Sequence, residues 1–316
     1  MQSGSCWLVT GVAGFIGSHL AESLLSQGQK VIGLDNLSSG KIGNIAHIKS
    51  NHNFSFIEGD IRDYKTCADA SKGADYILHH AAIGSVMKSI EDPVLVDQVN
   101  NGGFINIMLA ASNSGVKCVV YASSSAIYGE KGGGKRHESE MLQPLSPYAA
   151  SKCANEHYAA ALSNSFGVNA VGLRYFNIYG ARQDPNGAYA AVIPKWINAM
   201  LVGENIEIFG DGESVRDFCY IGDVVQANIL AATGSHKLGG NAVYNIASGQ
   251  KTTINELFLY LKKSTGYELN AAYKDFRISD IRISCADISK AQKDLGFKPS
   301  VTFQDGLADT VRWYKG

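Results

Sequence analysis

The sequence lacks any apolar run near the roughly 20 residues that a membrane-spanning helix needs, and its start has no basic stretch leading into an apolar one. We therefore expect neither a membrane span nor a signal peptide. It also lacks an excess of charge of one sign, because 28 lysines and arginines face 29 aspartates and glutamates. Such a chain has no broad electrostatic attraction to nucleic acid or to an acidic membrane, so neither partner is expected.

Close pairs of cysteines and metal-binding spacings of histidine are missing as well. The six cysteines stand far apart, and several lie in apolar surroundings. This arrangement favours buried thiols in a reducing cytoplasm over a disulfide framework. The eight histidines show no spacing typical of a zinc site. We predict a cytoplasmic protein without a bound metal.

What the chain does contain, at its start, is the order strand, glycine-rich turn, helix, strand and acidic residue. The pieces are the strand 6–9, the glycines Gly11, Gly14 and Gly17, the helix 18–25, the strand 30–34 and the pair Asp35-Asn36. In such a unit the glycines allow a tight turn, a close approach of pyrophosphate and close helix–strand packing, while the helix N-terminus attracts phosphate. Asp35 would accept hydrogen bonds from ribose hydroxyls and repel a 2′-phosphate, which favours NAD over NADP. An α/β turn without a nucleotide is the alternative.

Strands and helices continue to alternate beyond this unit. Strands are expected at 54–63 (with an exit loop), 76–82, 118–122, 170–176 and near 243–246, and helices around 92–114 and 190–202 and from Pro147 onwards. The alternation predicts an α/β fold with a doubly wound parallel sheet and with ligands beyond the carboxyl ends of the strands. With 316 residues, of which 45% are hydrophobic, the chain can form a hydrophobic core large enough for two lobes. We assign 1–176, plus about 217–247, to the dinucleotide-binding domain, and 177–216 and 248–316 to a smaller mixed α/β lobe.

Tyr148 and Lys152 lie one turn apart on the same face of the helix that Pro147 begins. A tyrosine ionises near pH ~10, so a phenolate at neutral pH needs a shift of about three pKa units, roughly 4 kcal/mol. A nearby ammonium and a second cation can supply that shift. The pair is therefore a candidate acid/base, and a chance pair on a solvated helix face is the alternative.

Five motifs follow one another along the chain: Gly11-x-x-Gly14-x-x-Gly17, Asp35-Asn36, Ser124, Tyr148-x-x-x-Lys152 and Arg174-Tyr175-Phe176-Asn177. In this order they resemble the extended short-chain dehydrogenase/reductase superfamily. Over essentially its whole length the chain is similar to the UDP-sugar 4-epimerases of that superfamily. The segments 182–194 and 210–218 look most like the group that prefers N-acetylated UDP-hexosamines.

The resemblance implies a Rossmann-like fold, a bound NAD and a UDP-sugar substrate held by the smaller lobe. Tyr148, as phenolate, would take the proton from the sugar 4-hydroxyl. Lys152 would lower the pKa of Tyr148 and bind the nicotinamide ribose, and Ser124 would hydrogen-bond the same sugar oxygen. The residues implied in NAD binding are Gly11, Gly14, Phe15, Ile16, Gly17, Asp35, Asn36, Asp60, Ile61, Ala81, Ala82, Asn100, Ser123, Tyr148, Lys152 and Tyr175. For Asp60 and Ile61, which would meet the adenine, a plain loop is the alternative.

The substrate residues implied by the same resemblance are Gly84, Ser85, Ser124, Asn177, Gln183, Ala191, Val192, Arg216, Arg277, Asp280 and Ser284. Arg216 and Arg277 would hold the diphosphate with Asn177, and surface ion pairing is the alternative for both arginines. Glucose-specific relatives commonly carry a bulky tyrosine at the position of Ser284, so the small serine leaves room for an N-acetyl group. An ordinary polar loop residue is the alternative there.

These residues predict a UDP-N-acetylhexosamine 4-epimerase that interconverts UDP-GlcNAc and UDP-GalNAc through a 4-keto intermediate. Ser125 and Ala126 follow Ser124 where related dehydratases and decarboxylases carry a carboxylate, which disfavours elimination chemistry. Epimerases of UDP-N-acetylhexosaminuronic acid or of UDP-glucose and UDP-galactose are alternatives, and a non-catalytic NAD-binding regulator is a remote one.

Family likeness also implies a homodimer in which the helix around 97–113 and the helix of Tyr148 pair across a two-fold axis. Ile105, Met108 and Leu109 permit that contact but suit an internal core equally.

Overall fold

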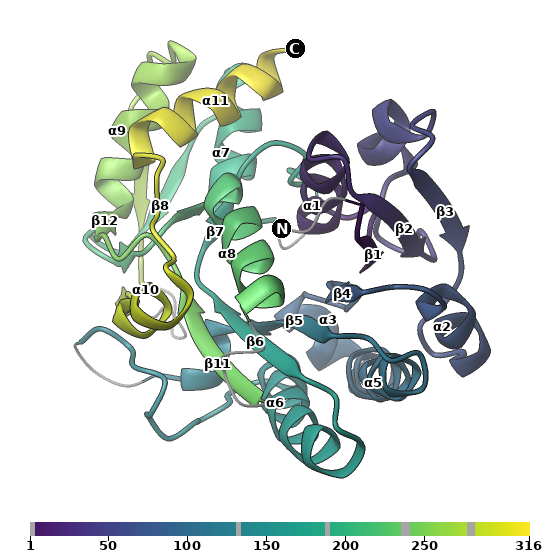
Figure 1. Ribbon diagram of the computed structural model, residues 1–316. Helices are drawn as coiled ribbons and strands as arrows, with labels where there is room; N and C mark the ends of the chain where they lie inside the picture. Colours follow the sequence, from purple (N-terminus) through teal and green to yellow (C-terminus); the bar gives the residue numbers. More distant parts are fainter. Residues whose placement is uncertain (1–3, 131–133, 187–189, 235–240, 277–281) are drawn as a thin grey trace.

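The computed structural model describes residues 4–130, 134–186, 190–234, 241–276 and 282–316. Within them, the centre of the molecule is a seven-stranded sheet in which every neighbouring pair is parallel (Figure 1). In spatial order its strands are β11 (Asn241–Ile246), β6 (Ala170–Tyr175), β5 (Cys118–Ser124), β4 (Tyr76–His79), β1 (Cys6–Thr10), β2 (Lys30–Asp35) and β3 (Phe54–Glu58). The strand order reverses between β1 and β4, where a doubly wound sheet leaves a crevice for ligands. The predicted fold class is confirmed.

Helices cover both faces of the sheet, because successive strand residues point to opposite sides. On one face, Trp7 and Val9 of β1 belong to a core shared with α1 (Phe15–Ser26) and α8 (Ile221–Gly234). On the other face, Leu8 packs in a second core with α2 (Tyr64–Ser71) and α5 (Gly103–Asn113), beside α6 (Pro147–Phe166). Figure 1 shows α1 and α8 on one side of the sheet and α5 and α6 on the other.

The single helix expected at 92–114 is divided in the structure. Asp92 caps α4 (Pro93–Asp97), a π-helical turn follows at Gln98–Gly102, and α5 begins at Gly103. Before it, α3 (Val86–Glu91) forms a separate short helix. Single π-helical turns of this kind are frequent at functional sites. Here the π turn buries Asn100, whose contacts are described below.

A smaller mixed lobe with its own apolar core follows. Its helices are α7 (Val192–Leu201), α9 (Ile254–Thr265) and α11 (Phe303–Lys315). The helix α10 (Ser289–Leu295) instead packs against β11 and α8, with Ala291 and Leu295 in the core of the main sheet. The short strands of the smaller lobe are β7 (Ile178–Tyr179), β8 (Glu207–Phe209), β9 (Val215–Arg216), β10 (Cys219–Tyr220), β12 (Thr252–Thr253), β13 (Ala272–Lys274) and β14 (Ile283–Ser284). Trp196, Leu257 and Phe303 lie in its core. The assignment of this lobe to substrate and of the sheet to cofactor stays a prediction.

Candidate functional site

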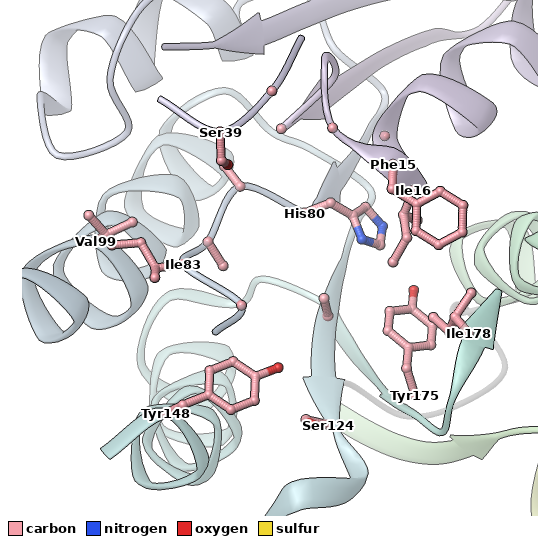
Figure 2. Close-up of a pocket in the computed structure, with 18 of the residues that line it drawn as sticks. Phe15, Ile16, Ser39, His80, Ile83, Val99, Ser124, Tyr148, Tyr175 and Ile178 are labelled. Carbon is pink, nitrogen blue, oxygen red and sulfur yellow. The ribbon is translucent and has the colours of Figure 1, made fainter. Parts of the chain in front are cut away.

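A cleft of about 830 Å³ opens at the carboxyl ends of the central strands and extends to the smaller lobe. Most of the predicted site residues line it: Gly11, Gly14, Phe15, Ile16, Gly17, Asp35, Asn36, Asp60, Ile61, Ala81, Ala82, Gly84, Ser123, Ser124, Tyr148, Lys152, Tyr175, Asn177, Gln183, Ala191 and Val192. These residues come from segments far apart in the sequence, and they meet because parallel strands end at one edge of a sheet. Figure 2 shows part of this wall, with Phe15, Tyr148 and Tyr175 around one cavity.

The glycine turn has the shape that a dinucleotide needs. Gly11 adopts a φ of +69°, in the left-handed region that favours glycine, and a Cβ added there would lie 2.7 Å from the Ala81 nitrogen. A Cβ at Gly17 would lie 2.1 Å from the Gly11 carbonyl oxygen. Gly14 caps α1, so no side chain occupies the N-terminus of the helix where phosphate binds. The turn therefore fits the pyrophosphate of NAD.

Asp35 and Asp60 stand together at the ends of β2 and β3. Asp35 is buried and accepts hydrogen bonds from the backbone nitrogens of Ala13 (2.9 Å) and Leu37 (2.8 Å). Asp60 accepts from Asn36 (2.9 Å) and twice from the guanidinium of Arg62 (3.0 and 2.7 Å). The hydrogen bonds from Arg62 lower the pKa of Asp60 to about 2, against the opposing effect of burial. This acidic end of the cleft suits ribose hydroxyls and an adenine amine. Asp60 is held in place there by its hydrogen bonds with Asn36 and Arg62.

Ser124, Tyr148 and Lys152 meet at the opposite end. Ser124 ends β5, while Tyr148 lies in the first turn of α6, which Ser146 caps by accepting from the Ala149 nitrogen (3.1 Å). Figure 2 shows Tyr148 and Ser124 on neighbouring parts of the wall, with the phenol directed into the cavity. The Lys152 Nζ donates to the Ala122 carbonyl (2.9 Å) and lies 6.0 Å from the centre of the Tyr148 ring.

The pKa of Tyr148 in the protein without a cofactor is set mainly by burial. Burial raises it above 10.0, and a hydrogen bond with Ser124 opposes that rise only in part. Burial likewise lowers the pKa of Lys152 to about 8. The protein alone thus holds Tyr148 as a neutral phenol, because its desolvation outweighs the hydrogen bond with Ser124. A positive charge brought close to the phenol would favour the phenolate.

Behind Ser124, a buried ion pair fixes the helix that carries Tyr148. Glu156 on α6 accepts from Ser123 (2.6 Å) and from two guanidinium nitrogens of Arg174 on β6 (2.9 and 2.7 Å). Arg174 also donates to the Tyr128 hydroxyl (2.8 Å). The pair and Ser123 are almost fully buried, and this network joins α6 to β5 and β6 next to Ser124.

One wall of the cleft contains His80, which the sequence analysis missed, beside Tyr175, which it predicted. Their rings stack with centres 6.0 Å apart, and Figure 2 labels both side chains. Asn228 of α8 holds both, donating to the Tyr175 hydroxyl (2.8 Å) and contacting Nε2 of His80 (3.0 Å). Burial lowers the pKa of His80 to about 4, so its ring is neutral. No local pattern marks Asn228, whereas Arg62 and His80 adjoin residues that were predicted.

Several predicted site residues lie outside the cleft wall. Asn100 is buried behind it and exchanges two hydrogen bonds with the backbone of Ile83 (2.8 and 3.1 Å). Ser85 caps α3 by accepting from the Lys88 nitrogen. Arg216 and Ser284 pair in register between β9 and β14, beyond the lining residues. Arg277 and Asp280 lie outside the described residues.

The described part of the chain has neither a candidate metal site nor a candidate membrane-spanning helix. It contains no group of three or more histidine, cysteine, aspartate or glutamate residues that could hold a metal ion. No described helix is long and apolar enough to cross a membrane. All six cysteines are free thiols, and four of them are buried.

Comparison with known proteins defines the class. Residues 7–247 match the model of the NAD dependent epimerase/dehydratase family. The chain is 38% identical to a putative UDP-glucose 4-epimerase of Methanocaldococcus jannaschii and 36% identical to the UDP-glucose 4-epimerase of Mycolicibacterium smegmatis, with 98% of each chain covered in both cases. The chain therefore belongs to the NAD-dependent epimerase/dehydratase family.

Solved structures narrow the class further. A UDP-N-acetylglucosamine 4-epimerase from Methanobrevibacter ruminantium, in complex with UDP-N-acetylmuramic acid, is 40% identical with a TM-score of 0.94, covering 99% of both chains. The UDP-glucose 4-epimerase of Thermus thermophilus, in complex with NAD, is 36% identical with a TM-score of 0.87, covering 98% of this chain and 99% of that one. With the cleft described above, these relatives identify an NAD-dependent epimerase, which is an isomerase.

Proposed function

We propose that this epimerase acts on UDP-N-acetylhexosamines and interconverts UDP-GlcNAc and UDP-GalNAc. The observation that carries the proposal is the unpaired side-chain oxygen of Gln183 in the cleft. This Oε1 atom is buried and has no hydrogen-bond partner among the described residues, and Gly84 and Ala191, which line the same cleft, are small. A buried acceptor is costly when unpaired, and the N–H of an acetamido group is a matching donor. The solved relative from Methanobrevibacter ruminantium supports the same choice.

In the proposed reaction, Tyr148 removes the proton from the sugar 4-hydroxyl and later returns one to the 4-keto oxygen. An NAD held in this cleft would supply the acceptor and donor of the C4 hydride and a positive charge that favours the phenolate. Ser124 hydrogen-bonds the same sugar oxygen, and Lys152 adds its ammonium beneath the Tyr148 ring. The glycine turn and Asp35 hold the dinucleotide in place. No net redox change occurs, since each cycle restores both the proton and the hydride.

Among the other substrates, UDP-glucose and UDP-galactose have the best support, because the curated relatives at 38% and 36% identity carry the name UDP-glucose 4-epimerase. A uronic acid is less well supported. The described lining residues include only two cations, Arg62 and Lys152, and neither is placed to pair with a sugar carboxylate.

Dehydration is also disfavoured, although dTDP-glucose 4,6-dehydratases are among the relatives at 34% identity. The only carboxylates among the described lining residues are Asp35 and Asp60, at the far end of the cleft from Tyr148. Ser125 and Ala126 follow Ser124, so no acid there can protonate a leaving hydroxyl.

The deciding experiment incubates the purified protein separately with UDP-Glc, UDP-Gal, UDP-GlcNAc and UDP-GalNAc and follows the 4-epimer of each by chromatography. We expect conversion of the N-acetylated pair with the higher kcat/KM. Conversion of UDP-Glc together with no formation of UDP-GalNAc from UDP-GlcNAc would refute the N-acetyl assignment.

The proposal includes a cytoplasmic homodimer that pairs α5 and α6 across a two-fold axis. Met108 is buried in the core of the subunit, whereas Ile105 and Leu109 are only partly buried and remain available for contact. Tyr158 and Phe166 of α6 are exposed. Analytical ultracentrifugation at micromolar concentration tests the proposal, and a monomer there would contradict it.

A further inference from the structure

The loop after β7, residues 180–186, is attached to α1 by a group of polar contacts that the proposed reaction does not use. Arg182 is at the centre, with a side chain only 11% exposed. Its guanidinium forms an ion pair with Glu22 of α1, donates to Nδ1 of His19 over 3.0 Å and donates to the Asn44 carbonyl over 3.2 Å. Three partners from the cofactor-binding part of the chain thus converge on one side chain of the loop.

The hydrogen-bonding roles of His19 follow from its two partners. A guanidinium has only donors, so Nδ1 of His19 accepts from Arg182. Nε2 must then carry the ring hydrogen, and it donates to the Ala181 carbonyl over 2.9 Å. Burial, with a smaller effect of Arg182, lowers the pKa of His19 to about 4, so the ring is neutral at physiological pH. His19 of α1 is therefore hydrogen-bonded to two consecutive loop residues, Ala181 and Arg182.

The backbone of Arg182 is unusual as well. Its φ of +66° lies in the left-handed region that residues other than glycine rarely adopt. Such strain persists only where the surroundings impose it, and it often marks a functional position. The next residue, Gln183, lines the cleft, donates from Nε2 to the Ile178 carbonyl (3.2 Å) and offers the unpartnered Oε1 described above. Its own carbonyl accepts from the Tyr314 hydroxyl of α11.

The same contacts reach the cofactor end of the cleft. Phe15, the first residue of α1, packs edge-on against His19 with ring centres 5.8 Å apart. Phe15 also lines the cleft beside the glycine turn, where Figure 2 shows it. A continuous series of contacts therefore runs from the phosphate-binding end of α1 through His19 and Arg182 to Gln183.

We propose that Arg182 and His19 are positioning residues that clamp the 180–186 loop to α1 and so place Gln183 against the sugar ring. Neither touches the reacting atoms, because both lie outside the cleft lining. The inference rests on the proposed function, since it assigns Gln183 to the sugar of a UDP-sugar. It adds that sugar recognition depends on a contact between the two lobes.

The test measures binding of two probes, UDP and a UDP-sugar, to the NAD-loaded full-length protein by calorimetry. The UDP-sugar is UDP-GlcNAc or UDP-glucose, whichever the wild-type protein binds. Arg182→Gly removes the guanidinium but accepts the left-handed backbone without strain. We expect its Kd for the UDP-sugar to rise about tenfold and its Kd for UDP to stay within about twofold, because only the sugar contact is displaced. We expect kcat/KM to fall by about 10- to 100-fold.

The matched control is a second ion pair between the 180–186 loop and the cofactor-binding part of the chain. Lys41 pairs with Asp184 of the loop over 2.9 Å, but both side chains are exposed. Exposed pairs of this kind contribute little, so Lys41→Ala should leave both Kd values unchanged. Gln183→Ala gives the reference for loss of the sugar contact. In that background, Arg182→Gly should cause no further change in binding of the UDP-sugar.

The proposal is wrong if Arg182→Gly weakens UDP and the UDP-sugar equally, because that result indicates general disruption. It is also wrong if the substitution has its full effect in the Gln183→Ala background. Should Arg182→Gly fail to fold, Glu22→Gln provides the same comparison with a milder change, and unchanged UDP-sugar binding there overturns the proposal. A wild type that binds UDP-GlcNAc without epimerising it refutes the proposed function alone, while binding of neither sugar nucleotide refutes both.

Discussion

Replacing Lys152 with methionine should stabilise the nucleotide-free protein while removing its activity. The side chain is 4% exposed, and burial lowers its pKa from 10.5 to about 8. At about 1.4 kcal/mol per pKa unit, this shift means that the charged ammonium destabilises the folded state by roughly 3 kcal/mol. Methionine is similar in length and uncharged, but it loses the hydrogen bond from the charged ammonium to the Ala122 carbonyl, worth about 1.5 kcal/mol. We expect a net gain of about 1.5 kcal/mol near neutral pH.

The gain should depend on pH in a defined direction. Below the folded-state pKa of about 8, Lys152 is charged in both states and the full penalty is present. Between about 8 and 10.5 the folded protein releases this proton while the unfolded chain keeps it, so wild-type stability rises relative to the variant. The advantage of Lys152→Met therefore shrinks as the pH increases through this window.

Thermal unfolding of nucleotide-free protein measures the effect. We expect Lys152→Met to raise Tm by roughly 2 °C near pH 7 and by less than half of that near pH 9.5. Lys65→Met is the matched control, because Lys65 on α2 is 83% exposed and should give no such gain. A variant no more stable than wild type near pH 7, or a gain independent of pH, would show that burial of the ammonium is not the source of the shift.

Three further substitutions test separate parts of the site. Tyr148→Phe should lower kcat by about 10²- to 10⁴-fold with UDP-GlcNAc binding retained, and full activity would overturn its assigned role as acid/base. Gly17→Ala should yield protein with little bound NAD and a lower Tm, because the new Cβ would lie 2.1 Å from the Gly11 carbonyl oxygen; normal NAD content by absorbance would contradict this. Arg174→Met should cost about 3–5 kcal/mol in urea unfolding by leaving Glu156 buried and unpaired, and a loss under 1 kcal/mol would refute that reading.

The cofactor end of the site could be read from the sequence because its signals are local. The spacing of Gly11, Gly14 and Gly17, followed by a helix and by Asp35, reflects the geometry of one strand–turn–helix unit. The structure brings these residues into one cleft, as predicted. Asp60 was placed there as well, but its pairing with Arg62 needed the structure.

The sugar end was harder because its residues come from distant segments. Ser85, Arg216 and Ser284 were assigned by likeness to relatives, and the structure places all three outside the cleft lining. Asn228 and Arg182 carry no motif, since their importance comes from partners about 50 and 160 positions away. Pattern analysis detects periodicity and short spacings, and it contains no information on such contacts.

The sequence by itself determined the alternating α/β architecture, the dinucleotide turn and the pairing of Tyr148 with Lys152 one helical turn apart. Each of these follows from local geometry, in which the chemistry depends on neighbours within a few residues. Only the tertiary structure decided the protonation of Tyr148, because burial by other segments raises its pKa more than the nearby groups lower it. It also decided how the loop of Gln183 is attached to α1, since those contacts form only when the two lobes pack together.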